Sequence, residues 1–172
     1  MSIPILKVKK IFPDAKLPVR EHDTDSGADV FVYRFEKYYH ILGTAYNEII
    51  IDNIEHLNYS GVLSLYSNER VLINTGIMAT VGRGYEIQVR PRSGNALKRG
   101  LTVLNTPGTI DESYRNFIGV ILINLSPDIQ IINLGEKIAQ LVVCPVIYSP
   151  IIEYDNLDKT DRNENGFGST GN

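Results

Sequence analysis

The sequence contains very few of the residues from which disulfides and thiolate metal sites are built. Among its 172 residues there is one cysteine, Cys144, and there are three histidines. A single cysteine excludes an internal disulfide and a thiolate metal site, and it is typical of proteins that work in a reducing compartment. We therefore expect a cytoplasmic protein.

Long apolar runs and a strong excess of one charge are also absent. No run approaches the ~20 apolar residues that a membrane-spanning helix needs, and residues 1–4 do not open a signal-peptide hydrophobic region. The net charge is −3 at pH 7, whereas binding along duplex nucleic acid requires a face rich in lysine and arginine. We expect no membrane and no nucleic-acid partner, so a polyanionic ligand would have to be met by a local group of cations.

The sequence does contain a series of short runs rich in Ile and Val, separated by turn signals. Runs of about four to eight such residues are typical of strands, and no segment keeps a helical period. Clear examples are residues 3–8, 71–73, 118–123 and 138–143. A chain of 172 residues with 43% hydrophobic residues can bury a sizeable core as one domain. The sequence therefore predicts a single all-β domain.

One short helix is predicted at residues 93–99, with Ser93 as the N-cap and Gly100 as the C-terminal stop. Arg90 and Arg92 stand directly before it. Two guanidinium groups, a hydroxyl and the free N–H groups of a helix start then lie within a few residues, which indicates an anion site. A capped helix with a surface arginine pair is the alternative.

The segment 105–115 is a second stretch that bears chemistry. Its turn at Pro107 and Gly108 is followed by Asp111 and Tyr114. An aspartate and a tyrosine this close together on a hairpin can point into one pocket, where the carboxylate holds a water and the ring packs against a sugar. An ordinary turn is the alternative.

The last residues form a glycine-rich tail. Gly166, Gly168 and Gly171 fit the spacing of a dinucleotide fingerprint, but no strand precedes them, only Asn172 follows them, and no lysine accompanies them. Both the dinucleotide fold and the P-loop are therefore excluded. The remaining interpretation is a mobile tail that closes over an anionic, aromatic ligand such as a nucleotide, with a frayed terminus as the alternative.

Residues 34–66 differ from the rest of the chain. They hold five of the ten tyrosines and two of the three histidines, His40 and His56, in the least regular pattern. We expect a surface loop with an added hairpin around Gly43 or Gly61. The histidines have no cysteine or tight carboxylate cluster beside them, so packing is favoured over a metal site. Tyrosine is common in binding surfaces, so a protein partner here is a hypothesis.

Five short segments stand in order along the chain. They are residues 26–29, 91–94, 108–115, 135–141 and 166–171, which read SGAD, PRSG, GTIDESYR, GEKIAQL and GFGSTG. In this order and spacing they resemble the five motifs of the homotrimeric dUTPase family. The resemblance covers nearly the whole chain apart from residues 34–66, which make an unusually long insertion between the first two motifs. The tail also carries fewer glycines than is usual in the family.

The resemblance implies a distorted jelly-roll β fold with one short helix, assembled as a threefold homotrimer. Residues 1–160 would form the β domain, and residues 161–172 a mobile C-terminal arm that closes a neighbouring active site. The implied reaction is hydrolysis of dUTP to dUMP and pyrophosphate, which keeps uracil out of DNA and supplies dUMP for thymidylate synthesis. Mg²⁺ would be held through the substrate phosphates, with no direct protein ligand.

The resemblance also implies roles for single residues. Asp111 would orient the attacking water toward the α-phosphorus, with Asp29 in support, and Tyr114 would pack under the deoxyribose. Asn105 would present its backbone to the uracil edge, and Phe167 would stack on the base. The implied substrate-binding residues are Arg92, Ser93, Gly94, Asn105, Gly108, Thr109, Ile110, Tyr114 and Gln140, with Arg162, Phe167, Gly168, Ser169 and Thr170 from the arm.

Two alternatives are weighed against this reading. The related dCTP deaminases share the fold but place a catalytic glutamate in the strand after the third motif, where this chain has the aliphatic residues 119–124. A partner-binding or regulatory protein on the same fold would use the tyrosine-rich segment as its interface. It is disfavoured as a purely non-catalytic reading, because Asp111, Tyr114, Arg162 and Phe167 are all present.

Overall fold

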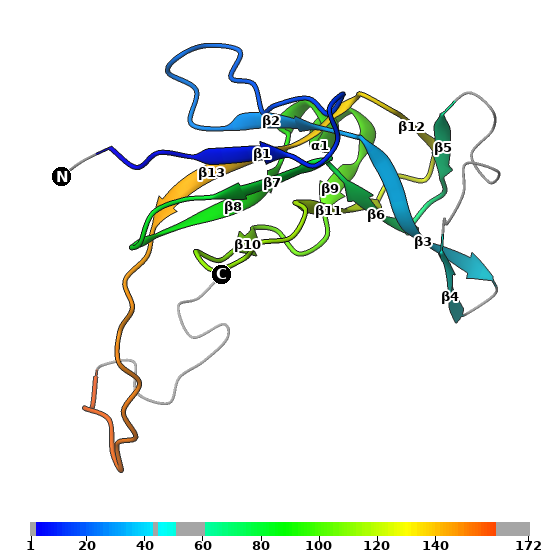
Figure 1. Cartoon of the computed structure of the whole chain (residues 1–172). Coiled ribbons are helices and arrows are strands. Elements are labelled where there is room, and N and C mark those ends of the chain that lie inside the picture. The colour runs from blue at the N-terminus through cyan, green and yellow to red at the C-terminus, as the bar shows by residue number, and fades with distance from the viewer. Residues whose placement is uncertain (1–2, 43–44, 51–60, 161–172) are drawn as a thin grey trace.

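The computed structural model describes residues 3–42, 45–50 and 61–160. Short strands dominate this part of the chain, as the Ile- and Val-rich runs predict (Figure 1). The strands are β1 (Lys7–Lys10), β2 (Ala28–Phe31), β3 (Arg34–Leu42), β4 (Ala45–Ile50), β5 (Val62–Leu65), β6 (Arg70–Asn74), β7 (Ile77–Thr80), β8 (Tyr85–Pro91), β9 (Leu101–Val103), β10 (Gly108–Ile110), β11 (Gly119–Asn124), β12 (Gln130–Asn133) and β13 (Lys137–Pro145), and the helix is α1 (Ser93–Arg99).

Two larger antiparallel sheets organise the molecule. One contains four strands in the order β10-β8-β13-β2, and the other contains five in the order β4-β3-β6-β11-β9. Two pairs, β1-β7 and β12-β5, complete the described strands. The non-consecutive neighbours bring distant parts of the chain together, most importantly β2 and β8 on either side of β13.

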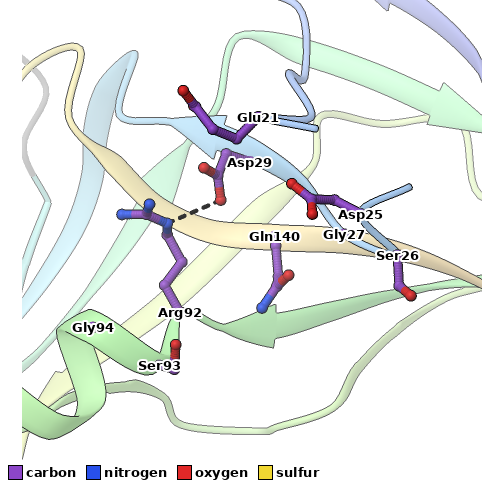
Figure 2. A pocket seen from close by; sticks show the side chains of 9 residues that line it. All are labelled: Glu21, Asp25, Ser26, Gly27, Asp29, Arg92, Ser93, Gly94 and Gln140. Atoms are coloured by element: carbon purple, nitrogen blue, oxygen red, sulfur yellow. Dashed lines mark hydrogen bonds and ion pairs between the residues drawn. The ribbon is translucent and has the colours of Figure 1, made fainter. Parts of the chain in front are cut away.

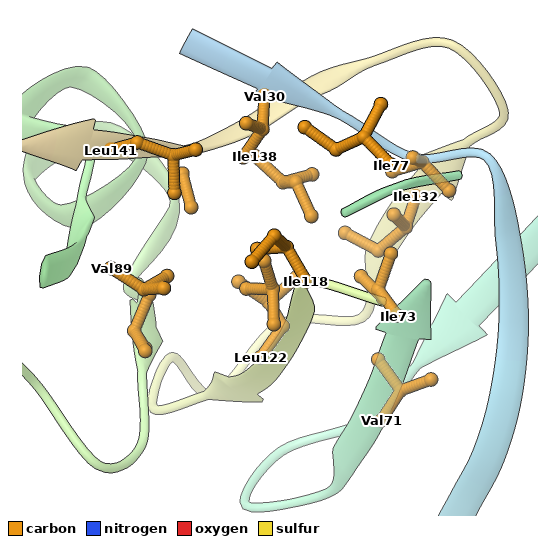
Figure 3. Packing of buried hydrophobic residues seen from close by; sticks show 14 of the residues in the cluster. Val30, Val71, Ile73, Ile77, Val89, Ile118, Leu122, Ile132, Ile138 and Leu141 are labelled. Atoms are coloured by element: carbon orange, nitrogen blue, oxygen red, sulfur yellow. The ribbon is translucent and has the colours of Figure 1, made fainter. Parts of the chain in front are cut away.

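The core lies where the inner faces of the sheets meet (Figure 3). Val89 and Leu141 of the four-stranded sheet and Ile73 and Leu122 of the five-stranded sheet are at most 2% exposed. Alternation along each strand directs these side chains inward. Each aliphatic side chain buried in this way contributes about 1.5–3 kcal/mol relative to exposure, so the core gives the strands that carry the site a rigid base.

The predicted helix is confirmed with one correction at its start. The N-cap is Arg92, which makes no side-chain capping hydrogen bond, and Ser93 is the first helical residue rather than the cap. Gly100 ends the helix in the left-handed conformation with φ 64°, where its N–H bonds to the carbonyl of Ala96. Glycine adopts this conformation without steric cost, which explains the stop.

The prediction of a surface loop for residues 34–66 is wrong at both ends. β3 pairs with β6 and carries Phe35, which is 2% exposed in the core, and β5 pairs with β12. The predicted hairpin near Gly43 is confirmed, because Leu42 pairs with Ala45. An irregularity between Phe35 and Lys37 interrupts the register of β3, so the period-two pattern that would identify a strand is broken.

A buried carboxylate anchors β3. Glu69 is 1% exposed, and it accepts hydrogen bonds from the Tyr38 hydroxyl and from the backbone N–H of Tyr66 at 2.8 Å. Burial and this hydrogen bond raise the pKa of Tyr38. Such a pairing satisfies a charge that would otherwise be costly inside the protein, and it fixes the first half of β3 against the β5–β6 turn.

The histidines that were considered for a metal site lie largely outside the part of the chain that the structure describes. The side chain of His40 and all of His56 lie outside the described residues. Within residues 3–42, 45–50 and 61–160, no group of three or more His, Cys, Asp or Glu side chains is arranged to hold a metal. The described ranges also contain no helix with the length and apolarity to cross a bilayer.

Candidate functional site

A pocket of about 330 Å³ opens where β2, β13 and the start of α1 meet (Figure 2). It unites five of the residues predicted from the sequence, which are Asp29, Arg92, Ser93, Gly94 and Gln140. Four further lining residues come from the loop before β2, namely Glu21, Asp25, Ser26 and Gly27. Three of the five sequence motifs therefore meet at this one place.

Strand register explains why these motifs meet. β13 lies between β2 and β8, so Gln140 stands opposite Asp29 on one side and Arg90 on the other. β8 then leads directly into α1, which places Arg92 and Ser93 at the rim of the pocket. The positions of these side chains follow from the pairing of core strands and are therefore fixed by the fold.

An ion pair between Arg92 and Asp29 forms part of the pocket lining (Figure 2). The Arg92 Nε donates to Asp29 Oδ1 at 2.9 Å, and the Lys137 Nζ lies 3.2 Å from Asp29 Oδ2. The Asp29 side chain is only 16% exposed, so both contacts are shielded from water and are stronger than surface pairs. Asp29 is therefore in direct contact with Arg92, which the resemblance assigns to phosphate binding.

The orientation of the Gln140 side chain is fixed by a hydrogen bond and by the close approach of the Gly27 backbone. Its Nε2 donates to the Pro91 carbonyl at 2.9 Å. A Cβ atom at Gly27 would lie 1.9 Å from the Gln140 Oε1, a distance that two non-bonded heavy atoms cannot adopt. Only glycine at position 27 therefore allows Gln140 to take this orientation.

Lys137, which the sequence did not identify, contacts two of the pocket residues, Glu21 and Asp29. Its Nζ lies 3.0 Å from Glu21 Oε2, and its carbonyl accepts from Arg92 Nη1 at 3.4 Å and from Asn95 Nδ2 at 3.3 Å. The hydrogen bonds with Glu21 and Asp29 raise the pKa of Lys137, while Lys137 lowers the pKa of Glu21. Both groups are therefore charged at neutral pH.

The second group of predicted residues lies on β10 and in the turn that follows it. The hairpin expected here is wrong, because β10 pairs with β8, whereas β9 and β11 belong to the other sheet. Asp111 follows Ile110 directly and is exposed, and the Tyr114 N–H bonds to the Asp111 carbonyl at 3.1 Å. Tyr114 is 37% exposed, and its hydroxyl donates to the Phe117 carbonyl at 3.0 Å. A carboxylate and an aromatic ring thus share one tight turn. The other predicted positions on β10 and in the turn before it are Asn105, Gly108, Thr109 and Ile110, of which Asn105 and Thr109 are exposed and Gly108 and Ile110 are buried.

Within one chain, Asp111 in the turn after β10 is far from the pocket. Ile110 of β10 pairs with Ile87 of β8, whereas Arg92 stands beyond the opposite end of β8. At about 3.3 Å per residue, the path from Ile87 to Arg92 spans roughly 16 Å, and Asp111 lies further on in the other direction. The predicted residues thus form two separate groups. The predicted arm residues, which are Arg162, Phe167, Gly168, Ser169 and Thr170, lie outside the described residues.

The chain is similar in sequence to a well-defined group of proteins. A family model described as dUTPase matches residues 56–171. A deoxyuridine 5'-triphosphate nucleotidohydrolase of Hydrogenobaculum sp. is 44% identical over 166 residues, which covers 96% of this chain and 97% of the relative. The protein of the same description from Clostridium novyi is 42% identical, with 96% and 98% covered.

Solved structures agree on the fold. A dUTPase of Staphylococcus bacteriophage 80alpha with dUpNHpp has a TM-score of 0.69 and 22% identity, and the match covers 97% of this chain and 98% of that chain. A mutant dUTPase from phage phi11 of S. aureus, whose structure shows the coordination of a structural Mg(II) ion, has a TM-score of 0.66 and 21% identity, with 90% and 99% covered.

Proposed function

The chain belongs to the dUTPase family and hydrolyses dUTP, and we propose that it does so at a site to which different copies of the chain contribute. One copy supplies the pocket around Arg92 and Gln140, and another supplies the turn after β10 with Asp111 and Tyr114. The products are dUMP and pyrophosphate.

The observation that carries this proposal is the separation of the two groups along β8. Asp111 follows Ile110 beside the first residues of β8, whereas Arg92 follows the last residue of that strand, yet phosphoryl transfer requires the attacking water and the phosphate-binding cation to meet at one phosphorus atom. A second copy of the chain supplies the missing half at each end, and a closed ring of three copies satisfies every half-site.

The segment that follows β13 supports an assembly. Residues 146–160 run away from the body of the molecule (Figure 1) and expose a set of large apolar side chains. These are Ile147, Ile151, Ile152, Tyr154 and Leu157, each at least 68% exposed. A soluble chain rarely leaves so much contiguous apolar surface in water unless another surface covers it. We infer that this segment packs on a neighbouring copy and leads residues 161–172 to that copy's site.

Charge neutralisation at the phosphates falls to Arg92 and the first backbone N–H groups of α1. The N–H groups at a helix start have no partner within the helix, and Arg92 lines the same pocket, where its guanidinium pairs with Asp29 (Figure 2). Ser93 is exposed beside them. In this account Gln140 contacts the phosphate chain, and Arg162, Ser169 and Thr170 close on the terminal phosphate.

The residues of the pocket fit Mg²⁺ that arrives with the nucleotide. Asp29 is engaged by two cations, and the described residues offer no carboxylate cage. Mg²⁺ keeps several of its waters and is commonly held by phosphate oxygens. When bound, the ion would neutralise charge on the phosphate chain, and the protein would hold it indirectly.

The residues of β10 and of the turns on either side of it carry the remaining roles. The exposed Asp111 carboxylate orients and deprotonates the attacking water, and the half-exposed ring of Tyr114 packs under the deoxyribose and excludes a 2′-hydroxyl. The Asn105 backbone reads the uracil edge, beside Gly108, Thr109 and Ile110, and Phe167 of the arm stacks on the base. Deamination has no support, because β11, the next strand along the chain, contains no acidic residue.

Pyrophosphate release tests the proposal when it is compared across dUTP, dCTP, dTTP and UTP, with and without Mg²⁺. We expect rapid, Mg²⁺-dependent turnover of dUTP alone. Comparable turnover of UTP or dTTP would contradict the proposed sugar and base recognition, and ammonia release from dCTP would support a deaminase instead.

A further inference from the structure

We propose that Lys137 is a positioning residue that keeps Arg92 available to the phosphates by sharing Asp29 with it, and that Glu21 opposes this by drawing Lys137 away. The inference rests on the proposed function, because it concerns the strength of phosphate binding in the same pocket.

The geometry places the four groups in a chain. Lys137 Nζ lies between Glu21 Oε2 at 3.0 Å and Asp29 Oδ2 at 3.2 Å, and the other oxygen of Asp29 accepts from Arg92 Nε at 2.9 Å. Only one edge of the Arg92 guanidinium is therefore occupied by the carboxylate. The side chains of Asp29, Lys137 and Arg92 are 16%, 30% and 33% exposed, so their charges interact strongly.

Charge balance decides what Lys137 does. If Asp29 faced Arg92 alone, one carboxylate would neutralise one guanidinium, and both oxygens could form the bidentate pair that this combination favours. Because Lys137 occupies the second oxygen, the trio keeps one net positive charge, and Arg92 pairs with Asp29 through Nε. Arg92 Nη1 donates to the Lys137 carbonyl at 3.4 Å, which fixes the orientation of the guanidinium beside the pocket.

Glu21 acts in the opposite direction. It lies on a loop that is fixed by its own contacts, since Arg20 Nε donates to the Asp25 carbonyl at 2.9 Å and the His22 N–H donates to Asp25 Oδ2 at 2.9 Å. From this loop the Glu21 carboxylate borders the phosphate pocket and pairs with Lys137. It brings a negative charge to a site that has to receive a polyanion, and it competes with Asp29 for the ammonium group.

The test is the direction of the change in two single variants. Lys137→Met should weaken binding of dUpNHpp and raise KM for dUTP about tenfold, the size expected for one charge-assisted hydrogen bond. Glu21→Gln should strengthen binding and lower KM by about two- to threefold, a smaller effect because this side chain is exposed. In both variants kcat should stay close to the wild-type value, which marks an effect on binding.

The opposite directions separate this role from a structural one. If the Glu21–Lys137 pair only stabilised the loop, either variant would break it and both would weaken binding. Matched controls are Asp23→Asn, an exposed carboxylate on the same loop, and Lys98→Met, an exposed lysine on α1. Both should leave the dissociation constant of dUpNHpp unchanged.

Changes in the same direction, or a Lys137→Met variant that behaves like Lys98→Met, would contradict the inference. If Lys137→Met does not fold, Glu21→Gln decides alone, and an unchanged or higher dissociation constant contradicts the role of Glu21. Failure of the wild-type protein to hydrolyse dUTP would instead contradict the proposed function.

Discussion

In the proposed mechanism Asp111 has to accept a proton from the attacking water, whereas the other polar side chains only bind the substrate. An amide at this position can still orient a water but is a poor proton acceptor. We expect Asp111→Asn to retain dUpNHpp binding and to lose kcat by at least about a hundredfold, in the range typical of a removed general base. The control is the neighbouring substitution Glu112→Gln. The Glu112 carboxylate accepts a hydrogen bond from the Tyr148 hydroxyl at 3.2 Å, so we expect this variant to keep most of the wild-type activity. Near-normal turnover of Asp111→Asn would remove the residue from this role.

Gly27 offers a test of how the pocket is shaped. A Cβ there would meet Gln140 Oε1 at 1.9 Å, so Gly27→Ala must move the Gln140 amide away from the Pro91 carbonyl. We expect KM for dUTP to rise about tenfold, which corresponds to the loss of one well-placed hydrogen bond to a charged group. Gly82→Ala is the matched control, since a Cβ at that exposed glycine has nothing within 4 Å. An unchanged KM in Gly27→Ala would show that Gln140 does not contact the substrate.

Residues within the motifs could be predicted from the sequence, whereas their partners could not. Arg92 and Gln140 stand in recognisable segments, and the structure brings them together. Glu21 carries no local signal, because it acquires its role only by meeting Lys137, which lies 116 positions further along the chain. The sequence did not predict the role of Lys137 for the same reason. Long-range pairing of charges depends on strand register, which composition and periodicity do not encode.

At the scale of elements, β3 shows where pattern reading fails. The helix at Ser93–Arg99 was predictable because its end signal is local, at Gly100. β3 was not, because a register irregularity follows Phe35, and its side chains pack on strands from other parts of the chain. Replacing residues 35–66 by a short turn, which a surface loop would tolerate, would remove β3 to β5 and should unfold the protein.

A single substitution measures this correction. Phe35→Ala should lower the free energy of unfolding by about 3–5 kcal/mol, because it opens a cavity in the core. Arg34→Ala, on the same strand with its side chain 51% exposed, should cost no more than about 1 kcal/mol. Thermal or denaturant unfolding of both variants would check the difference. If both variants lowered the free energy of unfolding by a similar, small amount, Phe35 would lie at the surface and not in the core. A role of the insertion in binding a protein partner stays a prediction.

At the scale of the whole molecule, the fold class was predictable, but the separation of Arg92 from Asp111 was not visible in composition or spacing. The antiparallel pairing of β10 with β8 sets Asp111 beside the first residues of β8, whereas Arg92 follows its last residue. This register is the reason for proposing that different copies of the chain complete the site. The resemblance implied a shared site, and the register gives a physical reason for it.

The C-terminal arm provides a further test at this scale. Ending the chain at Lys159 removes all the arm residues that the resemblance assigns to the substrate, while it leaves the described core almost intact. We expect a folded trimer that still binds dUpNHpp weakly and hydrolyses dUTP very slowly, because the contacts that close the site are lost. Full activity of the truncated protein, with trimer mass confirmed by light scattering, would make the tail an ordinary frayed terminus.

Complementation between two inactive variants tests the shared site most directly. Asp111→Asn and Arg92→Ala should each be nearly inactive as pure proteins, because every site lacks one half. When the two are unfolded together and refolded as a mixture, about a quarter of the sites in closed rings of randomly mixed chains should combine an intact Asp111 with an intact Arg92 from another copy. If the site is shared between copies, dUTP hydrolysis should reappear at about a quarter of the wild-type rate. A mixture that contains mixed trimers, shown by mass spectrometry, yet stays as inactive as its parents would contradict a site shared between copies.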